Sequence, residues 1–389
     1  MPESDKRLGD LTRLFLKLGT FAFGGPAAHI AMLEDEVVAR RAWMSREHFL
    51  DLIGATNLIP GPNSTEMAMH VGYERGGRVG LLVAGACFII PAVLITGALA
   101  WLYVRFGTTP ELTPFLYGLK PVVIAVIIGA VWRLGRTAVK NWQLAVVGVA
   151  VAAAVLLGLN EVIALLLGGV IGAAWLRAAS RFQAAAALML PPAGLDGITP
   201  AAGLLVTAAT VAGSISLWKL GLFFLKVGAV LYGSGYVLVA FLEGDLVEGY
   251  GWLTQSQLLD AIAIGQFTPG PVLSTATFIG YVVAGLPGAI VATIGIFLPS
   301  FVFVLILNPL IPRLRESAVA GAFLDAVNAS AVGLMAAVIG ILGLATLKDG
   351  FVWFVFVAAT ILVLRFRVNA VWLVVAGGLL GWVFAMLAG

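Results

Sequence analysis

Apolar residues fill this chain in runs of roughly 20, which short polar connections separate from one end to the other. A run of about 20 apolar residues forms a helix that can cross the ~30 Å hydrocarbon core of a bilayer. The runs fall into two sets, over approximately 11–33, 49–72, 79–104, 114–132, 142–158 and 161–177, then 220–242, 256–282, 287–311, 322–346, 351–364 and 369–388. A further apolar stretch, 199–217, lies between the sets. The pattern predicts an all-α polytopic membrane protein with about 12–13 membrane segments.

The second half of the chain repeats the first. Leu16-Lys17-Leu18-Gly19 reappears 209 positions later as Leu225-Lys226-Val227-Gly228. The same shift pairs Gly24 with Gly233, Glu34 with Glu243, Glu36 with Asp245, Trp43 with Trp252, Asp51 with Asp260, and Pro60-Gly61-Pro62 with Pro269-Gly270-Pro271. After a one-residue deletion the shift is 208 and pairs Pro91 with Pro299. Shared apolar composition cannot produce these matches, so we predict two homologous halves, 1–182 and 218–389, joined by 183–217.

The orientation of the halves depends on the extra stretch. If 199–217 crosses the membrane, the halves are opposed and form an inverted repeat. Basic residues favour cytoplasmic loops. With a cytoplasmic N-terminus, the loop of Arg133, Arg136 and Lys140 is inside, and the equivalent loop of the second half holds only Lys348. This reversal favours inversion, and it predicts a multi-pass protein of the cell inner membrane with a periplasmic or extracellular C-terminus.

One loop breaks the charge rule. Arg40, Arg41 and Arg46 lie outside if 11–33 is a simple crossing. If 11–33 and 49–72 are re-entrant hairpins, this loop returns to the cytoplasm and the orientation of the other segments is unchanged. Both models stay open.

Helix breakers interrupt the first two apolar segments of each half. They are Gly24-Gly25-Pro26 with its counterpart Gly233-Ser234-Gly235, and Pro60-Gly61-Pro62 with its counterpart Pro269-Gly270-Pro271. Proline lacks a backbone donor and clashes with the preceding turn, so Pro-Gly-Pro ends one helix and begins another. Broken backbone at membrane depth is tolerated only inside protein or beside a polar cavity. The restarted helix directs its free N–H groups and a partial positive charge into that cavity.

These donors suggest an oxyanion site near the bilayer midplane. A nest of neutral donors suits a tetrahedral oxyanion, whereas a cation site would need acidic rings or exposed carbonyls. The candidate substrate-binding residues are Lys17, Gly24, Gly25, His29, Asn63, Ser64, Thr65, Lys226, Gly233, Ser234, Ser274 and Thr275. The two lysines could instead snorkel to the interface, and His29 could be a packing residue. Kinked, closely packed helices are the alternative explanation of the breaks.

Glu66 and His70 are the candidates for proton coupling. They are four residues apart and share a helix face just after the first Pro-Gly-Pro motif. Neither has an ionisable counterpart in the second half, and histidine titrates near neutrality, as a proton relay requires. A pair on the helix surface near Arg75 is the alternative. Glu34 and Glu36 are interpreted as structural, with salt bridges to Arg40 or Arg41.

Composition excludes several other functions. Hydrophobic residues make up 61% of the 389 residues and charged residues 11%, whereas soluble domains average roughly 45–50% and about 25%. The formal net charge is +3, and the basic residues stand in short loops, which does not fit a nucleic-acid surface. Cys87 is the only cysteine, so a cysteine metal cluster is excluded. We expect no metal, no cofactor and no nucleic-acid partner.

Three motifs together resemble the chromate ion transporter (CHR) family. They are Phe23-Gly24-Gly25-Pro26 with His29, the loop of Glu34, Glu36, Arg40 and Trp43, and Asn57-Leu58-Ile59-Pro60-Gly61-Pro62-Asn63-Ser64-Thr65-Glu66. The resemblance covers nearly the whole chain, in the long two-domain form. It implies a transporter, not an enzyme, that exports chromate with the membrane potential or proton gradient as its energy source, and has sulfate as a competitor. The second half departs from the family pattern, because Tyr232-Gly233-Ser234-Gly235 lacks the proline and the histidine.

Other functions stay open at this point. Uptake or exchange of sulfate or another oxyanion would use the same site, because sequence does not set direction. A membrane-embedded enzyme acting on a phosphorylated lipid would need clustered acidic metal ligands or a nucleophile with its base, and only Glu66 with His70 approaches this. A packing scaffold would not need duplicated polar breaks. The expected partners are chromate or sulfate and the lipid bilayer, and a homodimer stays open.

Overall fold

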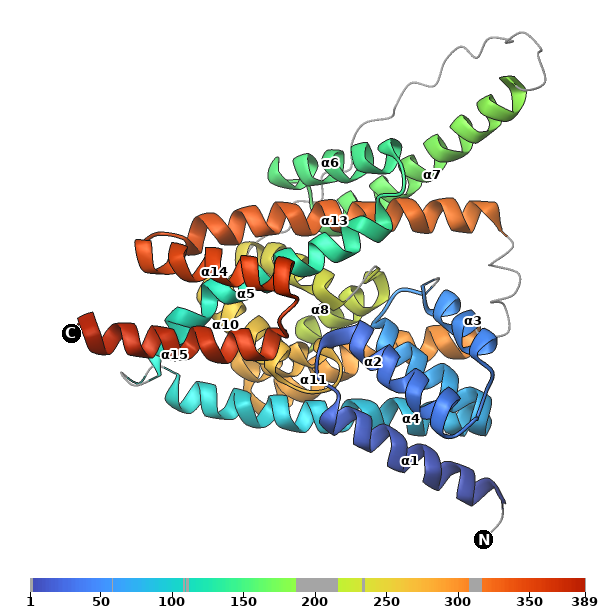
Figure 1. Cartoon of the computed structure of the whole chain (residues 1–389), viewed down its shortest axis with the longest axis horizontal. Helices are drawn as coiled ribbons and strands as arrows, with labels where there is room; N and C mark the ends of the chain where they lie inside the picture. The colour runs from blue at the N-terminus through green and yellow to red at the C-terminus, as the bar shows by residue number, and fades with distance from the viewer. Residues whose placement is uncertain are drawn as a thin grey trace.

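The computed structural model describes residues 3–57, 59–107, 109, 112–186, 216–232, 235–307 and 317–388. All regular structure in these residues is helical (Figure 1), so the prediction of an all-α protein is confirmed. Six of the described helical segments are long and apolar enough to cross a membrane, and two apolar helices are shorter. The protein is therefore a multi-pass membrane protein.

The same series of helices occurs twice. The first half contains α1 (Glu3–Phe21), α2 (Gly25–Glu34), the π-helix η1 (Asp35–Arg40), α3 (Arg46–Thr56), α4 (Asn63–Phe106), α5 (Thr113–Ala138), α6 (Trp142–Leu156) and α7 (Glu161–Ala186). The second contains α8 (Leu217–Val230), η2 (Gly235–Val237), α9 (Leu238–Phe241), η3 (Leu242–Gly249), α10 (Gln255–Phe267), η4 (Val272–Ser274), α11 (Thr275–Leu307), α13 (Ala318–Thr346), α14 (Gly350–Phe366) and α15 (Ala370–Ala388). We call residues at equivalent positions of the two halves repeat mates.

Side chains at equivalent positions cap the N-termini of equivalent helices in the two halves. Ser45 caps α3 and its repeat mate Thr254 caps α10, each accepting a hydrogen bond from the backbone N–H three residues later. Asn141 caps α6 and its mate Asp349 caps α14 in the same way. A side-chain oxygen at this position satisfies one of the free donors of the first turn. The local sequence thus sets the same helix starts in both halves.

The long helices α4 and α11 are each a hairpin. Non-helical dihedral angles at Gly76 and Gly77 divide α4, and those at Ala284 and Gly285 divide α11. In α4 the chain then doubles back, so that Gly72 and Gly80 meet backbone to backbone without room for a side chain. Each element is therefore a short return arm after the Pro-Gly-Pro break, followed by a membrane-length helix.

The two halves interlock through their C-terminal helices. Helix α7 packs antiparallel on α13 of the second half, and its mate α15 packs antiparallel on α5 of the first. The contacts are repeat mates: Gly168 against Ser330 and Gly172 against Ala326 in one pair, Gly377 against Val122 and Gly381 against Gly118 in the other. Small residues at these positions allow close approach of helices in lipid.

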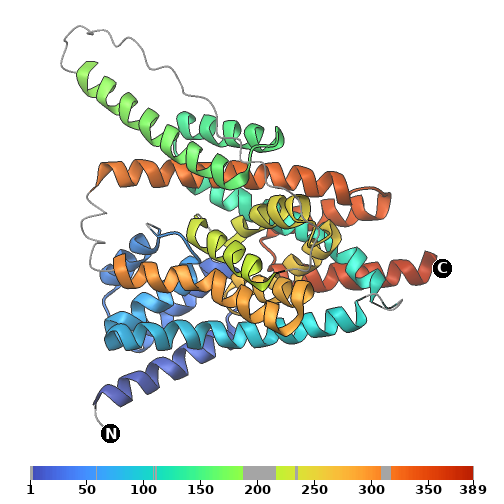
Figure 2. The ribbon, with the colours of Figure 1, turned by 180° about the vertical axis from the view of Figure 1, so that it is seen from behind.

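The halves have opposite orientations. Helices α5 and α13 are mates and run in opposite directions, and α1 begins at the end of the molecule opposite to the end where α15 finishes (Figures 1 and 2). The prediction of an inverted repeat is confirmed. The extra segment predicted at 199–217 lies, up to residue 215, outside the described residues.

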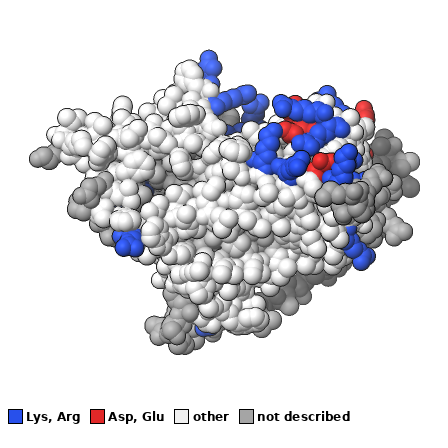
Figure 3. Space-filling view, turned by 90° about the horizontal axis from the view of Figure 1, so that it is seen from below, with Lys and Arg blue, Asp and Glu red and all other residues white. Residues whose placement is uncertain are grey.

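The first two segments are re-entrant, which resolves the misplaced arginines. Glu34 at the end of α2 pairs with Arg46 at the start of α3, with Oε1 and Nε 3.2 Å apart. The guanidinium of Arg75, at the turn of α4, lies 4.7 Å from the Trp43 ring centroid. These contacts return the loop to the end where α1 begins, and Figure 3 shows Lys and Arg side chains gathered there with a few carboxylates among them. Of the two models, the structure supports re-entrant hairpins.

The Pro-Gly-Pro loops tie the halves together at their breaks. Gly61 N–H of the first half donates to Leu231 O of the second over 2.7 Å, and Gly270 N–H of the second donates to Ala22 O of the first over 2.9 Å. Ala22 and Leu231 are repeat mates, as are Gly61 and Gly270. Each loop therefore satisfies a carbonyl that the interrupted first helix of the other half leaves free.

A substitution at Gly270 tests how closely these loops pack. Gly270 has φ +84°, and an added Cβ would lie 2.9 Å from Ala92 Cβ and 3.0 Å from Gly19 O. Gly251 has φ +61° but open space around the same position. We expect Gly251→Ala to lose about 1 kcal/mol of stability from the positive φ alone, and Gly270→Ala to lose clearly more. Thermal unfolding in detergent measures both. Equal decreases in midpoint would show that the loop is not closely packed.

Candidate functional site

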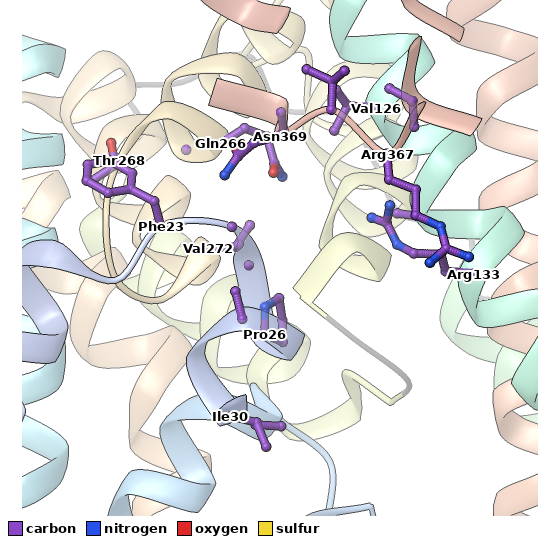
Figure 4. Close-up of a pocket in the computed structure, with 18 of the residues that line it drawn as sticks. Phe23, Pro26, Ile30, Val126, Arg133, Gln266, Thr268, Val272, Arg367 and Asn369 are labelled. Carbon is purple, nitrogen blue, oxygen red and sulfur yellow. The ribbon is translucent and has the colours of Figure 1, made fainter. Parts of the chain in front are cut away.

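Two of the predicted breaks, Gly24-Gly25-Pro26 and the loop at Gly270, line one cavity of about 480 Å³, together with Asn63, which directly follows the first Pro-Gly-Pro motif (Figure 4). The first half contributes Phe23 to Pro26, Ala28, Ile30, Asn63 and part of α5. The second half contributes the end of α14 with its connection to α15, and Gly265, Gln266, Thr268, Gly270 and Val272. Its polar lining consists of Asn63, Arg133, Gln266, Thr268, Arg367 and Asn369. No Asp or Glu occurs among the described residues that line it.

Backbone donors face this cavity at the start of α2. Gly24 and Gly25 have φ +108° and +78°, a conformation that side chains disfavour, and Pro26 stands in the first turn of the helix. The first N–H groups of α2 therefore have no helical partner and carry the positive end of the helix dipole. A Cβ on Gly24 would lie 3.6 Å from Asn369 Nδ2, which places a neutral amide donor beside them.

Two arginines supply positive charge. Arg133 lies on α5 and Arg367 between α14 and α15, and Figure 4 shows their guanidinium groups together on one side of the cavity. Neither forms an ion pair or side-chain hydrogen bond with any residue that the structure describes. Two adjacent cations repel each other, so an anion between them lowers the energy of both. Guanidinium groups also donate pairs of parallel hydrogen bonds to oxyanions.

Arg367 has a strained backbone. Its φ and ψ are +53° and +35°, in the left-handed region that favours glycine. Its repeat mate is Gly158, with φ +93°. The neighbouring mates Asn160 and Asn369 each accept a hydrogen bond from the N–H two residues later, so the turn is the same in both halves. An arginine where the other half has glycine makes Arg367 a candidate functional residue, because strain of this kind is concentrated at functional sites.

Several predicted residues lie at the cavity, and others do not. Gly24, Gly25, Pro26, Asn63 and Gly270 line it. Ser64, Thr65, Ser274 and Thr275 are buried behind the loops. Thr96 Oγ1 donates to Ser274 Oγ over 3.0 Å, and Thr275 Oγ1 donates to Val272 O over 2.8 Å. Gly233 and Ser234 lie outside the described residues.

Lys17 and Lys226 are held in ion pairs away from the cavity lining. Lys17 Nζ lies 2.7 Å from Glu36 Oε1 of η1, and its mate Lys226 pairs with Asp245 of η3. Glu36 also binds Arg41, with Nε and Oε2 3.1 Å apart, which confirms the structural salt bridge predicted for Glu36. Glu34 pairs with Arg46 instead of the predicted Arg40 or Arg41. The lysines thus fasten the first helix of each half to the segment that follows its break.

His29 holds the interrupted backbone in place. Its ring is 4% exposed and contacts Phe88 edge-on, with centroids 5.6 Å apart. His29 Nε2 lies 3.1 Å from Ala22 O, so it donates to the carbonyl that also accepts from Gly270 N–H. His29 is therefore a positioning residue for the contact between the halves.

Glu66 and His70 are buried, with exposures of 0% and 1%, so the alternative of a surface pair is wrong. A Cβ on Gly61 would overlap both Glu66 Oε1 and Ser300 Oγ, which places these two groups together behind the first Pro-Gly-Pro loop. Ser300 belongs to α11 of the second half. The carboxyl of Glu66 therefore lies between the halves, where a change of its charge acts on both.

The sequence did not identify Arg133 and Arg367 as residues of the site. Both stand in short connections or at helix ends and count as ordinary loop cations under the positive-inside rule. The missed signal is the substitution of Arg367 for its glycine mate Gly158, visible once the repeat is aligned through the end of α14.

Comparison with known sequences agrees with this architecture. The sequence profile of the family described as "Chromate transporter" matches twice, over residues 9–173 and 218–382. The "Chromate transport protein" of Pseudomonas aeruginosa is 35% identical over 95% of this chain and 90% of its own length. That of Cupriavidus metallidurans is 33% identical over 96% and 92%.

A "Probable chromate transport protein" of Synechococcus elongatus is 32% identical over 88% of this chain and 86% of its own length. No solved structure matches this chain. The duplicated match, the membrane helices and the shared motifs lead to one conclusion: the chain belongs to the chromate transporter family.

Proposed function

We propose that this protein transports tetrahedral oxyanions, chromate foremost, and that the cavity at the breaks is the binding site. The observation that carries the proposal is the pair Arg133 and Arg367, which face the first N–H groups of α2. Among the residues that the structure describes, neither arginine has a side-chain partner and no carboxylate lines the cavity. The names of the relatives and the family's resemblance motifs support chromate as the substrate.

The charge of the site matches a dianion. Two guanidinium groups balance the two negative charges of chromate or sulfate, and Asn63, Asn369 and the α2 backbone can donate to the remaining oxygens. Near a protein surface, one pair of unit charges about 4 Å apart contributes ~4 kcal/mol before desolvation is counted. Sulfate has the same charge and shape, so sulfate uptake or exchange is the second candidate.

The direction we propose is export from the cytoplasm across the inner membrane, with a cytoplasmic N-terminus and a periplasmic C-terminus. The re-entrant model brings Arg40, Arg41 and Arg46 to the end where α1 begins, which fits a cytoplasmic face. Glu66, buried between the halves with His70 one turn away, is the proposed proton carrier. It takes up or releases a proton as the halves move against each other.

Neutral substitutions test the arginines. We expect Arg133→Gln or Arg367→Gln to raise the KM for chromate and sulfate in reconstituted vesicles about 10- to 100-fold, because each removes a charged hydrogen bond to the anion. The matched controls are Arg136→Gln on the same helix and Arg365→Gln on α14, which do not line the cavity. Wild-type KM values in both cavity variants would rule out this site.

Arg367→Gly separates binding from stability. The change should raise the free energy of unfolding by about 1 kcal/mol, since glycine relieves the positive φ, while it weakens anion binding as much as Arg367→Gln does. Thermal midpoints in detergent and binding of labelled sulfate measure the two effects. A glycine variant no more stable than the glutamine variant would mean that the backbone of Arg367 is not strained.

Glu66→Gln tests proton coupling. We expect flux driven by an imposed pH gradient to lose its dependence on that gradient, while the KM for chromate stays within about twofold, because Glu66 does not line the cavity. Glu34→Gln is the control, since Glu34 pairs with Arg46 in the loop at the α1 end. A wild-type pH profile in the Glu66 variant would exclude Glu66 as the carrier.

A further inference from the structure

A second cavity of about 380 Å³ adjoins the first. The two share Asn63 and Leu134 in their linings. The second cavity is also lined by Asn57, Thr137, Lys140, Asp325 and Asn328. Asn63 Nδ2 donates to Asn57 Oδ1 over 2.9 Å, so a polar amide pair stands at the junction.

The two cavities are partly related by the repeat. Asn57, Ile59, Asn63 and Val237 of the second cavity are the repeat mates of Gln266, Thr268, Val272 and Ala28 of the first. Each cavity is thus formed beside one Pro-Gly-Pro loop and the break of the opposite half. An inverted repeat with alternating access uses equivalent surfaces of this kind along its path.

An ion pair lines the second cavity. Lys140 Nζ lies 2.6 Å from Asp325 Oδ1, joining the end of α5 to α13 of the other half. The side chains are 58% and 35% exposed, and exposed pairs of this kind contribute only about 0–1 kcal/mol. A dianion therefore competes effectively with one carboxylate for the ammonium group.

Cations and donors continue from one cavity to the other along α5. Arg133 lines the first cavity, Thr137 follows one turn later in the second, and Lys140 stands just beyond the helix end. Thr137 lies four residues, or about 6 Å of helical rise, beyond Arg133, and Lys140 follows three residues later, past the end of the helix. These neighbouring groups form a series along which an anion can pass from one cavity to the other.

We propose that the second cavity is a second oxyanion subsite, in which Lys140 binds the anion. When no anion is present, Asp325 pairs with Lys140 instead. The oxyanion class rests on the proposed function. The anion displaces Asp325 and binds Lys140, together with Thr137 and Asn57. It then passes Asn63 and reaches Arg133 and Arg367. The reverse route uses the same groups in the opposite order.

The subsite belongs to one end of the molecule. With the 208-residue shift, the repeat mate of Asp325 is Tyr117, and the mates of Lys140 and Asn141 are Lys348 and Asp349. In that copy Tyr117 donates to Asp349, so a hydroxyl and a carboxylate form the contact in place of a cation and a carboxylate. The exposed Asp349 carboxylate is held ionised, because the hydrogen bond from Tyr117 lowers its pKa. Both ends therefore have a lysine at this position, Lys140 and Lys348, but among the described residues only Lys140 forms an ion pair with the opposite half.

Stoichiometry and kinetics test the proposal together. Equilibrium binding of labelled chromate or sulfate to the purified full chain should give two anions per wild-type chain, and one in either Lys140→Gln or Arg133→Gln. In vesicles, Lys140→Gln should raise KM at least threefold for flux entering from the Lys140 end. Asp325→Asn should lower KM severalfold, because it removes the competing carboxylate.

Three controls make the outcome decisive. Lys140→Arg should retain two anions, the double variant of Lys140→Gln with Asp325→Asn should behave as Lys140→Gln alone, and Tyr117→Phe at the opposite end should leave this KM unchanged. One anion per wild-type chain, or a raised KM in Asp325→Asn, would overturn the subsite and leave Lys140–Asp325 as a structural bridge only. Absence of wild-type oxyanion binding and flux would instead reject the proposed function itself.

Discussion

The structure depends on how the protein satisfies backbone groups where helices stop inside the membrane. A free N–H or C=O in hydrocarbon costs several kcal/mol, so an interrupted helix needs a partner at the same depth. Here each Pro-Gly-Pro loop donates one hydrogen bond to the break of the opposite half, from Gly61 to Leu231 and from Gly270 to Ala22. Each half therefore completes the breaks of the other. Duplication and inversion thus explain how broken helices are stable in this chain.

The same constraint determines where the proposed anion site lies. Helix α2 restarts with free donors at Gly24 and Gly25, and the packing that completes the breaks brings α5 and the α14–α15 turn beside them. Neutral donors alone can bind many polar ligands, but Arg133 and Arg367 add two positive charges and the lining adds no carboxylate among the described residues. Such a site rejects cations by repulsion, and it favours dianions over monoanions because both guanidinium groups can be neutralised.

Much of this arrangement could be predicted from sequence. The repeat, the inversion and the breaks follow from matched Gly and Pro residues and from the charge of the loops, because these report directly on backbone geometry and membrane sidedness. Lys17 could not be placed in this way. Its ion pair with Glu36 exists because η1 folds back onto α1, a tertiary contact that spacing along the chain does not reveal. Arg367 could not be placed at the cavity for a related reason. The short helix α14 ends beside the cavity, and this is again a tertiary contact that the sequence does not show.

The two halves have the same arrangement of helices but carry different polar and charged side chains. Only the first half has Pro26, His29 and Glu66, and only the second has an arginine at the turn before its last helix. In an inverted repeat, a residue present in both copies acts equally toward either face, so it cannot by itself distinguish inside from outside. A residue that is present in only one copy can distinguish the two faces. Glu66 behind one loop and Arg367 beside the other give the site different chemistry on its two sides. Under the function proposed above, this asymmetry allows a symmetric scaffold to bind its anion from one face and to couple release to a proton at the other.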